Sequence, residues 1–494
     1  MAYRDLQEFV RRLEEAGELH RVRVPVSPRL EISEIADRVT KAGGPALLFE
    51  RVEGSEIPLL INAYGSAKRM AMALGVSDVE EIAAEISQML QLAPPQGLMD
   101  KLRIAGMLAR IAKFPPKIVR RGLCQEVVHQ EETADLLRLP IITCWPEDAG
   151  PYITLGQVYT KSLKTESRNV GLYRVQVFGP REAAMHWHMH HDGARHYREY
   201  CEANQRMPVA VVLGGDPALA YAATAPLPEG IDELLFAGFL RKEGVPLVRA
   251  KTLTRENGFP VDIEVPADAE IVIEGYLNPN ELVVEGPFGD HTGFYSLADR
   301  YPAFHITAIT HRERPIYPTT IVGKPPQEDY YLGKATERIF LPLLKMQMPE
   351  VVDMNLPIFG VFHNFVFVSI DKRYPWHAKK VMNAIWGTGQ MMFSKIIVVV
   401  DKHVNVQDPN EVWFYVGANV DPRRDIVFMD GPVDILDHAS PMLGIGSKMG
   451  IDATTKWPSE GFQREWPREI RMTEEIRELV RRRWREYGLP EGLL

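Results

Sequence analysis

The sequence predicts a multidomain protein of α/β and β type, in which an α/β unit, a mostly β domain and a second α/β domain follow one another. Three observations predict this order. Helix-like and strand-like segments alternate over residues 6–90, short strands broken by glycine and proline fill residues 126–310, and continuous apolar strands alternate with helices after residue 342. The 494 residues are enough for about two to four domains.

The first unit begins with an amphipathic helix that ends before Gly17. Its apolar residues recur at helical spacing, namely Leu6, Phe9, Val10 and Leu13. Further helix-like and strand-like segments alternate at residues 30–41, 46–49, 59–62 and 79–90. This alternation indicates a small α/β unit. A basic helical stretch at residues 101–121 is expected to link it to the next domain.

The middle of the chain has the pattern of a mostly β domain, such as a barrel. Strands are predicted at residues 170–178, 208–213, 270–277 and 304–310. One helix is predicted at residues 231–241, where the apolar side chains lie on one face.

The last third of the chain is predicted to form an α/β domain. Apolar strands at residues 361–370 and 395–401 flank a helix at 377–386, which is typical of a sheet covered on both faces. A final helix at 473–487 carries the arginine cluster Arg481, Arg482, Arg483 and Arg485. Such a helix either docks on a neighbouring subunit or remains a solvated basic helix.

Composition excludes several classes of protein. A hydrophobic share of 45% and a charged share of 25% are those of an ordinary soluble globular protein, and a net charge of −9 argues against a nucleic-acid binder. The three cysteines Cys124, Cys144 and Cys201 are too scattered for a disulfide framework or a thiolate metal site. No signal peptide or membrane-spanning run is visible, so we expect a cytoplasmic protein, with peripheral contact at the inner membrane if its substrate is hydrophobic.

The most unusual segment is residues 285–293, with the sequence Glu-Gly-Pro-Phe-Gly-Asp-His-Thr-Gly. Glu285 and Asp290 are separated by residues that shape the backbone, because glycine adopts angles that other residues resist and Pro287 fixes one more. Two interpretations remain open. Either both acids point at one reacting centre, or the segment is a surface turn whose acids face water.

Other candidate residues lie in three places. If residues 186–191 form a strand, then His186, His188 and His190 share one face, as in a zinc triad; otherwise they bind anions or line a rim. Upstream, Asn169 and Arg174 begin an apparent strand, and the arginine could pair with a carboxylate or an anionic substrate. Glu233 lies near the start of the predicted helix at 231–241, where an acidic side chain ordinarily just interacts favourably with the helix dipole.

Taken together, these segments resemble one protein family. The resemblance runs nearly end to end, through residues 31–38, 44–50, 143–149, 285–293 and 446–458 in that order. The chain resembles the UbiD family of prenylated-flavin-dependent decarboxylases, and is most similar to its 4-hydroxy-3-polyprenylbenzoate decarboxylase branch.

The resemblance implies an N-terminal α/β domain at residues 1–120 and a central split β-barrel of flavin-reductase type at 121–325 that binds prenylated FMN. It further implies a C-terminal α/β oligomerisation domain at 326–460 and a terminal tail and helix at 461–494. We therefore expect a homo-oligomer, either a dimer or a hexamer, with a flavin prenyltransferase as the supplier of the cofactor.

The resemblance also implies ligands. The cofactor phosphate would be held through Mn²⁺, with K⁺ nearby, and the matching metal ligands are Asn169, His190 and Glu233. Oxygen-rich ligation with one imidazole suits manganese better than zinc. The residues that fall on cofactor-binding stretches are Leu172, Tyr173, Arg174, His186, Trp187, His188, His191 and Asp192.

The family's catalytic network corresponds to Glu285, Arg174 and Asp290. Asp290 would be the proton donor, and its proximity to Glu285 is expected to discourage simultaneous ionisation of both acids. Family members that act on cinnamic acids carry glutamate where Asp290 stands, so the shorter acid fits the hydroxyarene branch. The implied reaction converts 4-hydroxy-3-polyprenylbenzoate to 2-polyprenylphenol in quinone synthesis.

Alternatives of different classes remain at this point. A related enzyme could decarboxylate or carboxylate another hydroxyarene acid, such as dihydroxynaphthoate or a phenolic acid. A zinc hydrolase would use His186, His188 and His190 and hold no flavin. A non-catalytic flavin carrier would bind the cofactor without turning over an aromatic acid, although both acids of the 285–293 segment favour an enzyme.

Overall fold

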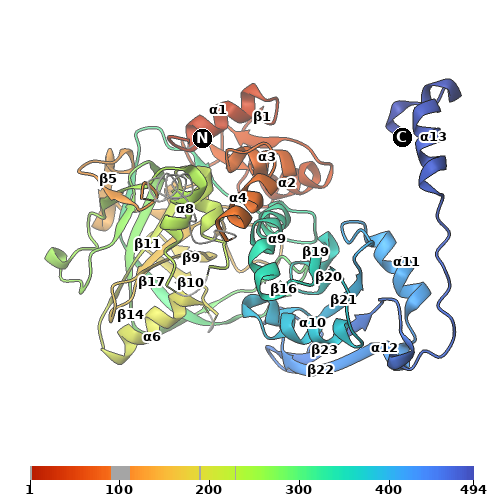
Figure 1. Ribbon diagram of the computed structural model, residues 1–494. Coiled ribbons are helices and arrows are strands. Elements are labelled where there is room, and N and C mark those ends of the chain that lie inside the picture. Colours follow the sequence, from red (N-terminus) through yellow and green to blue (C-terminus); the bar gives the residue numbers. More distant parts are fainter. Residues whose placement is uncertain (1–2, 91–111, 189–190, 228–229, 494) are drawn as a thin grey trace, which may run out of the picture.

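The computed structural model describes residues 3–90, 112–188, 191–227 and 230–493. Figure 1 shows an N-terminal domain in red and orange, a central domain built around a large sheet, and a C-terminal domain in blue. Of the linking helix predicted at 101–121, residues 101–111 lie outside the described ranges, and residues 112–121 form turns and the short strand β4 (Lys117–Ile118).

The N-terminal domain contains a four-stranded sheet that the predicted segments do form. Its order is β1 (Leu19–Val22), β2 (Ala46–Phe49), β3 (Leu59–Ile61) and β18 (Tyr317–Pro318), so the last strand comes from far along the chain. The helices are α1 (Leu6–Glu15), α2 (Glu31–Lys41), α3 (Ala67–Ala73) and α4 (Glu80–Leu90). Asp5 caps α1 by accepting a hydrogen bond from the Glu8 N–H, and the four predicted apolar residues are buried.

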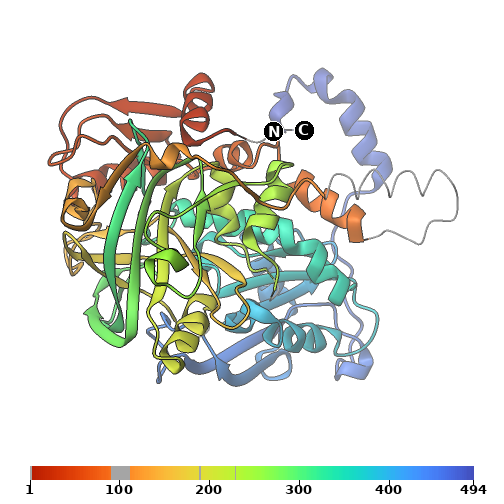
Figure 2. The ribbon, with the colours of Figure 1, turned by 90° about the vertical axis from the view of Figure 1, so that its left-hand side faces the viewer.

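The central domain is built on one antiparallel sheet, with the order β6-β9-β10-β17-β14-β11-β7-β8 and with β5 also paired to β17. Its strands are β5 (Val127–Gln130), β6 (Tyr152–Ile153), β7 (Gln157–Lys161), β8 (Arg168–Leu172), β9 (Val175–Gly179), β10 (Glu182–Met185), β11 (Met207–Gly214), β14 (Ala269–Glu285) and β17 (Asp299–His311). In Figure 2 the long green strands β14 and β17 curve across the domain.

Smaller elements complete this domain. The helices are α6 (Asp192–Glu202), α7 (Pro217–Ala222) and α8 (Glu233–Arg241). Strands β12 (Pro246–Arg249) and β13 (Glu264–Pro266) form a small sheet with β4, and β15 (Phe288–Gly289) pairs with β16 (Tyr295–Ser296).

The connection between β8 and β9 shows that the large sheet curls on itself. β8 is the last strand in the sheet order and β9 is the second, which would place them about 29 Å apart in a flat sheet. Only Tyr173 and Arg174 join them, and this piece of chain reaches about 10 Å. The two ends of the sheet must therefore meet, as in a split barrel, and Arg174 lies at the seam. The single strand predicted at 170–178 is broken at this point.

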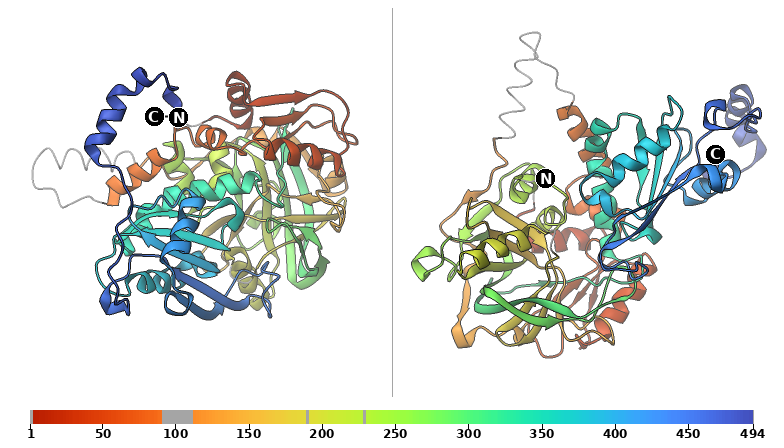
Figure 3. Two further views of the ribbon diagram at one scale, coloured as in Figure 1. Left: turned by 90° about the vertical axis from the view of Figure 1, so that its right-hand side faces the viewer. Right: turned by 90° about the horizontal axis from the view of Figure 1, so that it is seen from below.

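The C-terminal domain is an α/β sandwich with the sheet order β19-β20-β21-β23-β22. Its elements are α9 (Glu328–Gln347), β19 (Val351–Asn355), β20 (Phe365–Ile370), α10 (His377–Trp386), β21 (Ile396–Asp401), α11 (Pro409–Asn419), α12 (Pro422–Asp425), β22 (Ile426–Pro432) and β23 (Ile445–Asp452). Buried side chains fill both faces of the sheet, because Val366 and Phe367 belong to different core clusters. Figure 3 shows this domain beside the central one.

The terminal segment leaves the body of the molecule. After β23 the chain extends to α13 (Glu474–Arg483), which stands apart from the domains in Figures 1 and 3. No residue of α13 is buried. The sequence prediction of α/β, β and α/β domains with a terminal helix is thus confirmed. In the described part of the chain, no helix is long and apolar enough to cross a membrane.

Candidate active site

The 285–293 segment forms a loop at the end of β14. Glu285 is the last residue of that strand, and the loop then runs through Gly286 and Pro287 into the short strand β15. Two glycines have conformations or surroundings that other residues resist. Gly286 has a φ of +90°, and a Cβ at Gly289 would lie 2.2 Å from a carbon of the Trp145 ring.

Residues 143–149, one of the segments that carry the family resemblance, hold this loop in place. The Asp148 carboxylate accepts hydrogen bonds from the N–H groups of Gly289, Cys144 and Trp145 at 2.7–3.1 Å. The Ala149 N–H donates to the Pro287 carbonyl at 2.9 Å. Gln176 contributes as well, because its side-chain oxygen accepts from the Gly286 N–H at 2.8 Å. No motif or spacing in the sequence singles out Gln176.

Arg174 joins the two acids. Its Nε donates to Glu285 Oε1 at 2.8 Å and its Nη2 to Glu285 Oε2 at 3.2 Å, while Nη1 pairs with Asp290. The guanidinium also bonds the Ser296 hydroxyl at 3.1 Å and lies 4.7 Å from the centre of the Phe288 ring. The arginine side chain is only 9% exposed, and Glu285 is fully buried. The three predicted catalytic residues therefore lie together.

Both carboxyl groups are held in their ionised form. Burial alone would raise the pKa of each acid, but hydrogen bonds from His186 and Arg174 lower that of Glu285 to about 2. Burial is likewise outweighed at Asp290, where His291 and Arg174 hold the pKa well below its usual range. This differs from the expectation that the two acids would not ionise together, because Arg174 pairs with both carboxylates and His291 also bonds Asp290.

The histidine row lies beyond the strand that was expected to carry it, because β10 ends at Met185. His186 Nδ1 lies 2.9 Å from Glu285, and its Nε2 lies 2.8 Å from His188 Nε2. Burial lowers the pKa of both histidines, that of His188 to about 3. Both rings are neutral, so the N–H of His186 Nδ1 donates to Glu285 and His188 donates to His186.

The rings around His188 form a wall next to the acids. His188 stacks on His191 with ring centres 5.0 Å apart, and Tyr173 lies 5.0 Å from His191 and 6.1 Å from Trp187. Of the remaining predicted cofactor residues, Leu172 ends β8 and Asp192 begins α6, where it pairs with Arg195.

Two of the three predicted metal ligands are close to each other. Asn169 is buried in β8, and the Glu233 carboxylate at the start of α8 accepts a hydrogen bond from the N–H of the next residue, Val170, at 3.0 Å. The third predicted ligand, His190, lies outside the described residues. Within the described ranges, which leave out His190, no group of three or more His, Cys, Asp or Glu side chains is arranged to hold a metal ion.

The surroundings of these residues fit the implied groups. Burial raises the pKa of the Glu233 carboxyl to about 7, a state that a nearby cation would reverse. The buried indole nitrogen of Trp187 has no hydrogen-bond partner among the described residues. A carboxylate and an amide are ligands suited to Mn²⁺, and an orphaned N–H donor suits an anionic or carbonyl-bearing cofactor.

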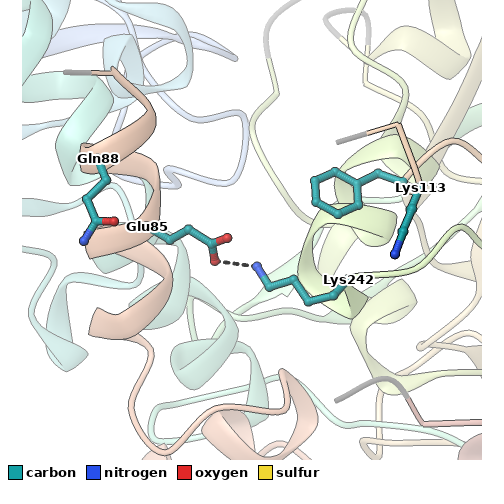
Figure 4. Close-up of a pocket in the computed structure, with 5 residues that line it drawn as sticks. Glu85, Gln88, Lys113 and Lys242 are labelled. Atoms are coloured by element: carbon teal, nitrogen blue, oxygen red, sulfur yellow. Dashed lines mark hydrogen bonds and ion pairs between the residues drawn. The ribbon is translucent and has the colours of Figure 1, made fainter. Parts of the chain in front are cut away.

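One cavity lies away from these residues. A cavity of about 530 Å³ is lined by Glu85, Gln88, Lys113, Phe114 and Lys242, and Glu85 pairs with Lys242 across it (Figure 4). None of these residues belongs to the acid and histidine cluster. The cavity therefore lies apart from the candidate active site.

Comparisons with known proteins agree with this geometry. Family models match three consecutive parts of the chain: the N-terminal domain of 3-octaprenyl-4-hydroxybenzoate carboxy-lyase at residues 10–88, its Rift-related domain at 117–325 and its C-terminal domain at 330–453. An uncharacterized protein of Archaeoglobus fulgidus is 51% identical over 98% of this chain and 99% of its own length.

Solved structures are similar over nearly the whole chain. The closed form of vanillic acid decarboxylase from Sedimentibacter hydroxybenzoicus has a TM-score of 0.84 at 29% identity, covering 98% of this chain and 99% of that one. The UbiD-class enzyme HmfF from Pelotomaculum thermopropionicum, in complex with FMN, has a TM-score of 0.76 at 32% identity, covering 94% and 97%. An evolved dimeric form of HmfF is in complex with prFMN and has a TM-score of 0.75 at 30% identity, covering 94% and 97%.

The three matched domains, in this order and with the acid network at the seam of the central sheet, define a carboxy-lyase of the three-domain type. More narrowly, this chain belongs to the UbiD family, as its motifs suggested.

We expect Arg174→Gln to raise the pKa of both Glu285 and Asp290 by about 1 to 3, because the variant removes the positive charge that holds both acids ionised. Carbon-13 NMR titration of carboxyl-labelled protein measures both values. Arg181→Gln, an exposed arginine, is the matched control and should leave them unchanged. Equal pKa values in Arg174→Gln and in the unmodified protein would contradict this account of the site.

Proposed function

We propose that this protein catalyses the non-oxidative decarboxylation of an aromatic hydroxy acid, with prenylated FMN as its cofactor. The observation that carries the proposal is the pairing of Arg174 with both Glu285 and Asp290 in the central domain of a UbiD-family chain. Support also comes from the solved neighbours, one a vanillic acid decarboxylase and the other an enzyme in complex with FMN or prFMN.

Decarboxylation replaces a carboxyl group by hydrogen, so each turnover needs one proton at the reacting carbon. When bound, prenylated FMN supplies the electron sink for the departing carbon dioxide. Asp290 is the proposed proton donor. Because Asp290 is ionised and paired with Arg174 in this structure, it must leave that pair and take up a proton before it can act. Arg174 remains bonded to Glu285 through two nitrogens, which keeps the guanidinium in place during this change.

Asn169, His190 and Glu233 are the proposed ligands of Mn²⁺, with K⁺ nearby. Glu233 would contribute a negative oxygen and Asn169 a neutral one, a donor set that suits a hard divalent ion. The ring wall of Tyr173, Trp187 and His188 would position the flavin, together with the other predicted cofactor residues: Leu172, Arg174, His186, His191 and Asp192.

Within this class we propose 4-hydroxy-3-polyprenylbenzoate as the substrate, in quinone synthesis. The chain that follows the 285–293 segment contacts the C-terminal domain, because the Phe294 ring centre lies 4.1 Å from that of His438. Both regions carry exposed apolar side chains, Leu297 at 84% and Leu443 at 64%. A prenyl chain would find apolar surface there, and such a substrate would bring the protein to a membrane surface. The vanillic acid decarboxylase neighbour favours a second candidate, a phenolic acid without a prenyl chain.

We further propose that the chain assembles as a homo-oligomer through its tail. Exposed apolar residues follow the last domain, at Ile470 (100% exposed), Met472, Ile476 and Leu479. The short helix α13 carries Ile476 and Leu479 and buries none of its residues against the described parts of the chain, so it is marginal in water by itself, which favours docking on a second copy. A flavin prenyltransferase is the proposed source of the cofactor.

The first test is activity. Protein produced together with a flavin prenyltransferase should show a modified-flavin absorption spectrum and release carbon dioxide from hydroxyarene acids. A panel that contains a 4-hydroxy-3-prenylbenzoate, vanillate and a dihydroxynaphthoate separates the candidates. Asp290→Asn should lower kcat by about 100-fold or more, because the proposed donor loses its acid. Asp299→Asn, an exposed acid on β17, is the control. Undiminished turnover by Asp290→Asn would refute the donor role.

The second test concerns the metal. Glu233→Gln should lower the manganese content of the purified protein and weaken flavin retention, because a neutral amide replaces an anionic ligand. Elemental analysis and flavin absorbance measure the two quantities. Glu243→Gln, beyond the end of the same helix and exposed, serves as the control. If the manganese content of the two variants is the same, Glu233 is not a ligand; stoichiometric zinc without flavin would instead favour the hydrolase.

The third test concerns assembly. A chain that ends at residue 466 should form a smaller species than the full chain, because the exposed apolar tail is removed. Light scattering coupled to gel filtration gives the mass. Arg482→Gln keeps the apolar side chains while removing one charge, and should keep the full mass. A truncated chain of unchanged oligomeric state would exclude the tail as the assembly element.

A further inference from the structure

His291 connects the proposed proton donor to the C-terminal domain. Its backbone N–H donates to Asp290 Oδ1 at 2.8 Å, and its ring Nδ1 lies 3.0 Å from the same oxygen. The other ring nitrogen, Nε2, lies 3.2 Å from Nε2 of His363, which precedes β20. One imidazole thus touches the acid on one side and the neighbouring domain on the other. The mechanism above gives no role to either histidine.

The loop that presents His363 is strained and tightly packed. Val361 and Phe362 have φ values of +39° and +70°, which is uncommon for any residue and costly for a β-branched one. The Phe362 ring lies 5.5 Å from that of His291 and presses on α9, where a Cβ at Gly333 would come within 2.4 Å of it. A strained backbone that persists next to an active site indicates that the position of His363 matters.

The charges around the pair differ for the two rings. Asp290, Asp329 and Asp434 face His291, and they raise its pKa to about 9 although burial opposes this. At His363, burial is the largest influence and lowers the pKa to about 4. The positive charges of His291 and Lys395 lower it further, whereas Asp434 and Asp437 act in the opposite direction. His291 is therefore an imidazolium and His363 a neutral ring, so the Nε2–H of His291 donates to His363.

We propose that His291 stores the proton that Asp290 delivers, and that His363 is the positioning residue that holds His291 for this task. The proposal rests on the proposed function, because it takes Asp290 as the donor. Asp290 breaks its O–H bond as the new C–H bond forms. Once free of Arg174, the resulting carboxylate takes the Nδ1 proton of His291. The neutral imidazole then regains a proton from water, and the hydroxide left behind combines with the released carbon dioxide as bicarbonate. No electrons are exchanged with an outside reagent.

The coupling to the C-terminal domain is the new element. His291 belongs to the central domain and His363 to the C-terminal one, so the contact exists only while the two domains are seated against each other. Proton supply would then depend on this contact between the domains. If the C-terminal domain were displaced, His291 would no longer be held in position to give Asp290 its next proton.

The first experiment needs no turnover. In full-length protein, NMR titration of ring-labelled histidines should show His291 protonated well above neutral pH. In His363→Phe its pKa should fall by about 1 to 2, because a hydrogen bond to a charged group is lost. His363→Gln keeps a hydrogen-bond acceptor and should leave the His291 pKa close to its value in the unmodified protein. His129→Gln, in a surface pair with His311, is the control. An unchanged His291 pKa in His363→Phe would overturn the proposed positioning.

The second experiment is kinetic and uses the holoenzyme with the best acid of the panel. His363→Phe should lower kcat about tenfold with KM unchanged, and His363→Gln should restore most of it. Because the active form needs protonated His291, the fall of kcat at high pH should move to lower pH in His363→Phe. A kcat and a pH profile equal to those of the unmodified enzyme would overturn the proton store.

The two experiments distinguish failure of the proposed function from failure of the proposed proton store. If the unmodified holoenzyme turns over no aromatic acid, the decarboxylase proposal and the proton store both fail, while the titration still decides whether His363 positions His291. If decarboxylation proceeds normally in His291→Asn, the proton store alone is overturned and the proposed function stands.

Discussion

The site depends on the ion pairs that Arg174 makes. Two carboxylates lie within reach of one another in a buried place, where each would ordinarily be driven to its neutral form. The guanidinium of Arg174 changes this, because its planar fork meets Glu285 through two nitrogens and Asp290 through a third. Its position follows from the fold: the curled sheet brings its two ends together, and the two-residue connection between β8 and β9 places the arginine at that seam.

The resting pair is also a constraint on function. An acid that is fully ionised and ion-paired cannot donate a proton. The arrangement is therefore a resting state, and substrate binding or domain movement must change it before Asp290 can act as the proposed donor. The C-terminal domain is the natural source of this change, because Phe362, His363 and His438 all lie against the loop of Asp290 and His291. Selectivity and proton supply would then be controlled at the same interface.

Local patterns were enough to predict the domain order, since helical spacing in α1 and continuous apolar strands such as β21 reflect burial directly. The break of the strand predicted at 170–178 could not be predicted, because Tyr173 and Arg174 fit a strand and only the closure of the sheet excludes it. The acids of the loop could be identified, but the ionisation of both could not, since it depends on Arg174, which lies more than a hundred residues away from each of them. His363 and Gln176 have no sequence neighbours that suggest chemistry.

The strand β18 has a consequence for how the protein is made. The N-terminal sheet acquires its fourth strand about 250 residues after β3, so a ribosome working at typical speed exposes the edge of β3 for roughly 10 to 50 seconds before β18 is synthesised. An open, apolar edge is a site for wrong pairing during that time. The first domain is thus completed only after most of the central domain has been synthesised, and a chain that stopped before β18 would lack the fourth strand of this sheet although β1, β2 and β3 were all present.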